Sequence, residues 1–117
     1  MEGAMFGFGR RRVMREVKAA ELKAMLDAES ALVVDVREPD EFAAGHVAGA
    51  VNLPLSRFDA AALPQAGEKT LVLHCLGGKR SAMALDRCAA AQAAVDTHLA
   101  GGVNAWTAAG FPLVRGA

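Results

Sequence analysis

Short apolar runs and segments with helical spacing alternate along the chain. Five apolar runs, rich in β-branched or long aliphatic residues, predict strands at residues 13–17, 31–36, 49–54, 69–75 and 94–99. Helical patterns predict helices at residues 19–30, 38–45 and 80–92, and a last short helix that opens with GGVNAW at 101–106. Strands that alternate with helices in this way are typical of an α/β domain with a mostly parallel sheet.

Three of these segments carry the clearest patterns. The run ALVVDV at 31–36 is apolar at almost every position, as in a strand that is buried on both faces. The run KTLVLHC at 69–75 is the cleanest strand in the chain. In the helix predicted at 80–92, the apolar stripe that should face the sheet consists of Ala82, Leu85, Cys88 and Ala89.

The composition is that of one ordinary globular domain. With 117 residues, the chain is long enough for a single hydrophobic core but too short for two. Thirteen basic residues balance thirteen acidic ones, so the net charge attracts neither a nucleic acid nor a membrane surface, and no such partner is expected. No apolar run approaches the ~20 residues that are needed to span a bilayer.

The first dozen residues, MEGAMFGFGRRR, differ from the rest in combining three glycines with a run of three arginines. We interpret residues 1–12 as a flexible basic arm and residues 13–117 as the folded domain. The arm has no small-residue cleavage site and does not resemble a signal peptide. The sequence therefore predicts a cytoplasmic protein in which Cys75 and Cys88 remain reduced.

The segment LVLHCLGGKRSA places a cysteine where a strand ends and a helix begins. Ligands of open α/β sheets bind beyond the carboxyl ends of the strands, and Cys75 lies at such an end. Gly77 and Gly78 allow the backbone to turn so that successive amides face one concavity. The helix N-terminus and the charges of Lys79 and Arg80 add positive potential. We therefore expect an ionised, solvent-reachable Cys75 sulfur that is surrounded by inward-facing amides, with a pKa below the free value of ~8.5.

Other interpretations of these residues fit less well. A lone cysteine often only fills space in a core, but the glycines and cations on the same side of Cys75 favour a nucleophile. A phosphate-binding nucleotide loop would need glycine where Leu73 stands and Ser or Thr where Arg80 stands. The histidines and cysteines show no metal-ligand spacing, so no metal is expected. Cys88 lies about 12 Å along the helix axis from the loop and is interpreted as core filler rather than a partner for an oxidised Cys75.

Four motifs together resemble those of a rhodanese-homology domain, over a stretch from about Val13 to Val114. In chain order they are LVVDVREPDEFAAGHVAGAVNLP (32–54), LVLHCLGGKRS (71–81), HLAGGVNAW (98–106) and GFPL (110–113). The resemblance implies an α/β fold with a five-stranded parallel central sheet and helices on both faces. It calls for no cofactor and no metal.

The resemblance also implies a sulfurtransferase with Cys75 as its nucleophile. The thiolate would take the outer sulfur of a small anionic donor, thiosulfate or a persulfide, and become a persulfide itself. A thiophilic acceptor would then remove that sulfur: cyanide in assays, or a thiol or thioredoxin-like protein in a cell. The substrate-binding residues that the resemblance implies are Leu76, Gly77, Gly78, Lys79, Arg80 and Ser81.

Asp35 and Arg37, at the end of a neighbouring strand, are expected to support the loop through hydrogen bonds and charge pairing. Arg80 either faces the substrate or pairs with Asp35 or Glu38, and the sequence leaves both arrangements open. His74 is expected to pack or support, because neighbouring strand residues point to opposite faces. Structural roles are also expected for His46, Asn52 and Trp106.

Two other functions remain open. The related phosphatases and arsenate reductases have five residues between cysteine and arginine, whereas four separate Cys75 from Arg80, and a smaller loop suits a single sulfur atom. A sulfur carrier or regulatory binding module would retain the same loop. Two-domain thiosulfate sulfurtransferases place a cation two residues after the cysteine, where this chain has Gly77. A persulfide or polysulfide donor is therefore as compatible with the loop as thiosulfate.

Overall fold

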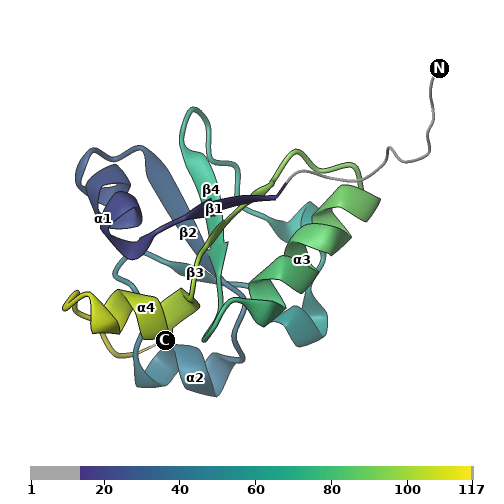
Figure 1. Ribbon diagram of the computed structural model, residues 1–117. Coiled ribbons are helices and arrows are strands. Elements are labelled where there is room, and N and C mark those ends of the chain that lie inside the picture. The colour runs from purple at the N-terminus through teal and green to yellow at the C-terminus, as the bar shows by residue number, and fades with distance from the viewer. Residues whose placement is uncertain (1–13, 117) are drawn as a thin grey trace.

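Five parallel strands form the centre of the structure (Figure 1). The computed structural model describes residues 14–116. In chain order the strands are β1 (Arg15–Val17), β2 (Ala31–Asp35), β3 (Val51–Asn52), β4 (Thr70–His74) and β5 (Thr97–Leu99). Across the sheet they run β1-β5-β4-β2-β3, and each neighbouring pair is parallel. The predicted α/β fold with a five-stranded parallel sheet is confirmed.

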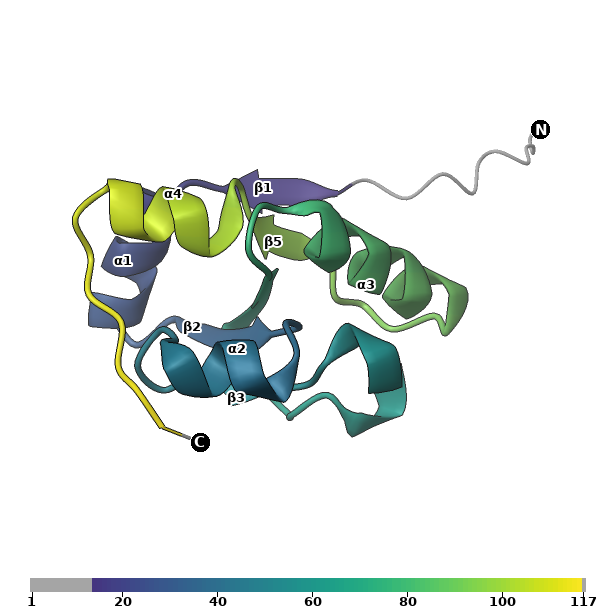
Figure 2. The ribbon, with the colours of Figure 1, turned by 90° about the horizontal axis from the view of Figure 1, so that it is seen from below.

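Helices cover both faces of this sheet, as predicted. They are α1 (Ala19–Asp27), α2 (Pro39–Ala44), α3 (Lys79–Ala90) and α4 (Gly102–Ala108), with short 3-10 turns at η2 (Leu55–Arg57) and η3 (Ala60–Ala62). Viewed from below, α1 and α4 lie on one side of the sheet and α3 lies on the other (Figure 2). Helix α2 lies near the carboxyl ends of the strands, where β2 and β4 finish.

The strands alternate their side chains between two hydrophobic cores. On the face of α1 and α4, Val33 and Val72 pack with Leu22 and Trp106. On the face of α3, the buried residues include Val34, Leu73, Leu85 and Cys88. Because side chains of a strand alternate with a period of two, consecutive residues of β2 and β4 feed opposite cores. Cys75 belongs to the α3 side, two residues after Leu73.

Two strands are shorter than the sequence predicts. The strand predicted at 49–54 is paired only over Val51–Asn52. Before it, the Ala50 amide donates to the Val47 carbonyl at 3.0 Å in a turn. The strand predicted at 94–99 is paired only over Thr97–Leu99. β5 ends at Leu99 as predicted, whereas β3 ends two residues before the predicted end at Pro54. β4 itself ends at His74, so the position of the loop after it is unaffected.

The buried face of α3 also differs from the predicted stripe. Ala82 and Ala89 are only half-buried. The residues that face the sheet are Ser81, Ala84, Leu85 and Cys88. The helix is therefore rotated so that a serine in its first turn, rather than Ala82, points into the protein. Cys88 is fully buried in the core, as expected.

The residues that were given structural roles make the corresponding contacts. His46 stacks on Phe42 with ring centroids 3.7 Å apart, and its Nδ1 lies 2.8 Å from the Phe42 carbonyl oxygen. Asn52 donates to two backbone carbonyls at the end of β2, at 3.0 and 2.9 Å. Trp106 donates from its indole Nε1 to the Pro112 carbonyl at 2.9 Å, which holds the C-terminal segment against α4.

The predicted basic arm, residues 1–12, lies outside the described residues. Within residues 14–116, none of the helices has the length and apolar character needed to cross a membrane.

Candidate active site

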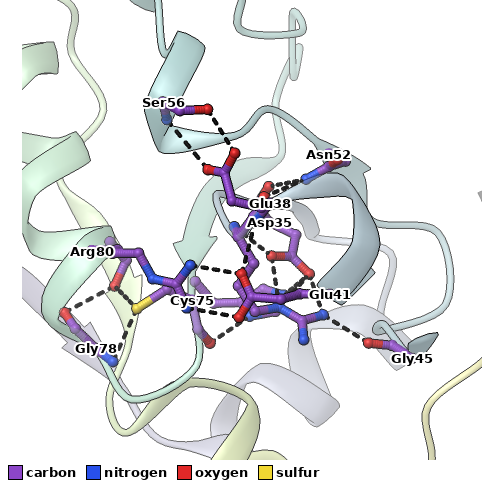
Figure 3. Close-up of polar contacts among 12 residues, drawn as sticks. Asp35, Glu38, Glu41, Gly45, Asn52, Ser56, Cys75, Gly78 and Arg80 are labelled. Carbon is purple, nitrogen blue, oxygen red and sulfur yellow. Dashed lines mark hydrogen bonds and ion pairs between the residues drawn. The ribbon is translucent and has the colours of Figure 1, made fainter. Parts of the chain in front are cut away.

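Cys75 follows β4 directly, and the chain then turns into α3 (Figure 3). Gly78, the residue before the helix, has a φ of 111°, in the left-handed region that glycine adopts without strain. This turn brings the Gly78 N–H to the cysteine, and the amide donates to the Cys75 Sγ over 3.0 Å. The glycine turn therefore directs a backbone donor at the sulfur.

The hydrogen bonds around Cys75 favour its thiolate. Burial alone would raise the pKa of the Cys75 thiol. The backbone amide and hydroxyl of Ser81 and the amides of Gly78 and Gly77 oppose this effect, and the net pKa lies below its ordinary value. A cysteine that only fills space in a core has no donors of this kind. Donors aimed at a sulfur are typical of a cysteine that ionises near neutral pH.

The Cys75 side chain is less accessible than the sequence suggests. We expected a solvent-reachable sulfur, but the residue is only 1% exposed, so this expectation is wrong. Apolar side chains of the α3 core enclose one side of the residue, and the loop covers the other. The loop itself reaches the surface, because Leu76, Gly77 and Lys79 are exposed. Any molecule that reaches the sulfur must therefore approach through the loop.

The loop is anchored by the first turn of α4, which the sequence did not indicate. The amide of Val103 donates to the Cys75 carbonyl at 2.9 Å, and the amide of Asn104 donates to the Leu76 carbonyl at 3.0 Å. Gly102 makes this approach possible: a Cβ on it would lie 2.4 Å from the Cys75 carbonyl oxygen. With their carbonyls held by α4, the loop peptides are fixed while Gly78 N–H points at the sulfur.

Arg80 pairs with neither of the residues named for it. Its Nη1 and Nη2 donate to the two carboxylate oxygens of Glu41 on α2, at 2.7 and 3.0 Å. Glu38 instead accepts from the Ser56 hydroxyl at 2.6 Å (Figure 3). The hydrogen bond from Arg80 lowers the pKa of Glu41 to about 2, and the same bond raises the pKa of Arg80. This two-pronged pair ties α2 to the start of α3.

Asp35 and Arg37 form a buried pair beside the loop rather than in it. The Asp35 carboxylate accepts from the Arg37 backbone amide at 2.9 Å and from its guanidinium at 2.7 Å, and the guanidinium also donates to the Gly45 carbonyl at 2.7 Å. His74 lies 3.4 Å from Asp35 and is fully buried, and burial lowers the pKa of His74. The pair therefore lies next to His74, the residue before Cys75.

Ser81 connects the cysteine to a histidine that the sequence did not single out. The Ser81 Oγ lies 3.7 Å from the Cys75 Sγ and 2.7 Å from Nδ1 of His98, which belongs to β5. Ser81 is fully buried and His98 is 3% exposed. Between residues 14 and 116, no three His, Cys, Asp or Glu side chains have a geometry that could hold a metal ion.

The fold and the loop define an α/β domain with a cysteine at the carboxyl end of a parallel sheet, whose sulfur accepts a hydrogen bond from a loop amide. A family model described as "Rhodanese-like domain" matches residues 18–109. The chain belongs to this family, and the predicted resemblance is confirmed.

Two relatives and one solved structure place the chain within this family. It is 43% identical over 94 residues to "Uncharacterized protein slr1261" of Synechocystis, covering 80% of this chain and 52% of that protein. It is 40% identical over 91 residues to "Probable adenylyltransferase/sulfurtransferase MoeZ" of Mycobacterium tuberculosis, covering 74% of this chain and 23% of that one. The structure of a thiosulfate sulfurtransferase from Pseudomonas aeruginosa superposes with a TM-score of 0.75 at 25% identity, covering 89% of this chain and 21% of that one. The chain thus spans about half or less of each of these proteins, and some of its relatives are sulfurtransferases.

Proposed function

We propose that this domain is a sulfurtransferase that carries a sulfane sulfur on Cys75. The observation that carries the proposal is the hydrogen bond of 3.0 Å from the Gly78 amide to the Cys75 Sγ. A backbone donor aimed at a sulfur stabilises negative charge on it, both on the thiolate and on the persulfide that replaces it. The sulfurtransferase relatives support the same assignment.

The reaction proceeds in two displacements that balance without a cofactor. The Cys75 thiolate attacks the outer sulfur of the donor, a new S–S bond forms, and the bond inside the donor breaks. With thiosulfate, sulfite leaves with the electron pair. An acceptor thiolate then attacks the outer sulfur of the Cys75 persulfide, takes it as its own persulfide, and releases the Cys75 thiolate.

The charges around the loop favour a persulfide over thiosulfate as the donor. Both terminal nitrogens of Arg80 donate to Glu41, which neutralises the guanidinium charge that a dianion would need. Lys79 is the remaining cation of the loop and is exposed, where solvent weakens its attraction. A monoanionic persulfide needs less compensating charge than thiosulfate. The acceptor in this scheme is a thiol, either small or carried by a thioredoxin-like protein.

Steady-state turnover tests the proposal. Wild type is assayed with a small-molecule persulfide and with thiosulfate, each with a thiol or cyanide as acceptor, beside Cys75→Ala and the matched control Cys88→Ala. We expect turnover by wild type and Cys88→Ala, none by Cys75→Ala, and a higher kcat/KM with the persulfide. Equal turnover by Cys75→Ala and wild type would refute the assignment of the nucleophile. Hydrolysis of an aryl phosphate without any sulfur transfer would favour the phosphatase alternative.

A further inference from the structure

A continuous line of hydrogen-bonding groups leads from the Cys75 sulfur to the edge of the sheet. The Cys75 Sγ lies 3.7 Å from Ser81 Oγ, within reach for a sulfur donor, and Ser81 Oγ lies 2.7 Å from His98 Nδ1. His98 Nε2 lies 3.2 Å from Oε2 of Glu16. Glu16 and His98 are paired residues on the neighbouring strands β1 and β5, and Ser81 faces them from the first turn of α3. Three elements of the fold and the loop after β4 thus meet in one chain of contacts.

The carboxylate at the end of this line fixes where the protons lie. Neutral histidine has one N–H and one lone pair, and the nitrogen that faces Glu16 must carry the hydrogen, because a lone pair there would face a carboxylate oxygen. Nδ1 is then an acceptor, so the Ser81 hydroxyl donates to it. In this arrangement the Ser81 oxygen faces Cys75 with a lone pair, which can accept from a thiol S–H but cannot stabilise a thiolate.

A protonated His98 still donates from Nε2 to Glu16, but it reverses the direction of the other two bonds, His98–Ser81 and Ser81–Cys75. Nδ1–H then donates to the Ser81 oxygen, which leaves the Ser81 hydrogen to donate either to the sulfur or to the Gly78 carbonyl oxygen, 3.1 Å away; a negative charge on the sulfur draws it to the sulfur. That hydrogen stabilises a thiolate, and the Glu16 carboxylate stabilises the imidazolium. The hydrogen bonds of a neutral His98 therefore stabilise the Cys75 thiol, and those of a protonated His98 stabilise the thiolate.

We propose that Glu16, His98 and Ser81 form a relay that accepts the Cys75 proton when the thiolate forms. The proposal rests on the proposed function only in taking Cys75 as the nucleophile. The S–H bond breaks and leaves its electron pair on the sulfur, and the proton passes to Ser81 Oγ. The original Ser81 proton passes to His98 Nδ1, so no group outside the relay gains or loses a proton. His98 acts through Ser81 and is a positioning residue for the nucleophile.

The other charged groups near the relay have their own contacts. Arg80 of α3 is paired with Glu41 of α2, and Lys79 is exposed on the surface. From β4, His74 lies on the opposite face of the sheet, beside the Asp35–Arg37 pair. Glu16, the outer member of the relay, has a side chain that is 60% exposed.

The pH profile of Cys75 alkylation by a neutral reagent tests the relay without any sulfur donor. In the relay, His98→Leu removes the positive partner of the thiolate and moves the midpoint of the profile upward by about one pH unit. Below the midpoint, alkylation slows about tenfold. Glu16→Gln leaves the buried residues in place and should shift the midpoint in the same direction, with alkylation slower by about threefold. The matched control is Glu68→Gln, an exposed carboxylate before β4, whose profile should equal that of wild type.

If His98 served only for packing, His98→Leu would leave the midpoint of the profile unchanged or lower it, because the Ser81 hydroxyl would then donate to the Gly78 carbonyl oxygen or to the sulfur. An unchanged or lowered midpoint in either His98→Leu or Glu16→Gln overturns the relay. Imidazole ¹⁵N spectra give an independent reading if His98→Leu does not fold. At a pH where wild-type Cys75 is a thiolate, His98 should be charged in wild type and neutral in Cys75→Ala. The same ring charge in both proteins also overturns it. Alkylation needs no sulfur transfer, so failure of the relay and failure of the proposed function are separable.

Discussion

Gly102 is the residue at which the contact between α4 and the reactive loop can be tested most sharply. It has a φ of 58°, and a Cβ on it would lie 2.4 Å from the Cys75 carbonyl oxygen and 2.6 Å from that of Leu76. Gly102→Ala therefore combines two costs. The left-handed backbone costs about 1–2 kcal/mol for a residue with a Cβ. Displacing the loop backbone adds a cost typical of overpacking, about 1–3 kcal/mol.

Gly110→Ala is the matched control, because it lies at the other end of the same helix. Gly110 also has a positive φ, 87°, but a Cβ there would have nothing within 4 Å. The free energy of unfolding of Gly110→Ala should fall only by the backbone cost, about 1–2 kcal/mol. The difference between the two variants, about 1–3 kcal/mol, then measures the contact with the loop.

Urea unfolding and alkylation of Cys75 are the two assays. Gly102→Ala should unfold at a lower urea concentration than Gly110→Ala. It should also alkylate more slowly at neutral pH, because a displaced loop weakens the bond from the Gly78 amide and raises the pKa of Cys75. If the two variants have the same stability and both alkylate at the wild-type rate, α4 does not hold the loop in the way described here.

Two further predictions concern the ion pairs beside the loop. The pKa of Glu41 is about 2 because Arg80 hydrogen-bonds to it, so the pair stabilises the fold above about pH 4.5, and this stability is lost as the pH falls toward 2. Glu41→Gln should therefore be less stable than wild type near neutral pH, by about 1 kcal/mol, and this deficit should vanish in acid, as urea midpoints at both pH values would reveal. A deficit that persists unchanged in acid would contradict the pairing. Asp35→Asn removes the negative charge that pairs with the guanidinium of Arg37, a residue that is only 5% exposed. The variant should lose about 3–5 kcal/mol of unfolding free energy in the same assay. Asp27, whose side chain is 65% exposed, pairs with Lys23 on the surface, and Asp27→Asn should lose less than about 1 kcal/mol of unfolding free energy. An equal loss in both variants would show that burial of the Asp35–Arg37 pair is unimportant.

The sequence predicts the parts of this site that are contiguous along the chain. Cys75 stands at the end of the cleanest apolar run, and the two glycines after it have a conformational reason to be there. Strand, turn and helix follow one another within a dozen residues, so local pattern is enough to place them. The direction of the Cys75 pKa shift follows from the same local features, because its donors are the amides of that turn and the first residues of α3.

The parts that depend on packing between distant segments could not be predicted in this way. Glu41 is one helical turn beyond Glu38, and only the orientation of α2 decides which of them meets Arg80. His98 reaches the loop because β5 lies next to β4 in the sheet, an order that periodicity does not reveal. The burial of Cys75 was missed for a similar reason, since its side chain packs with residues of other segments, among them Val34 of β2 and Leu85 of α3.

The most direct test of the account is the mass of the intact protein after brief exposure to a persulfide or to thiosulfate. Wild type should gain the mass of one sulfur atom, Cys75→Ala should gain nothing, and a thiol acceptor should remove the added mass. Peptide mapping should place the adduct on Cys75 and leave Cys88 unmodified. An unmodified wild type with both donors, or the same adduct on Cys75→Ala, would contradict the claim that the loop holds a sulfur-accepting thiolate.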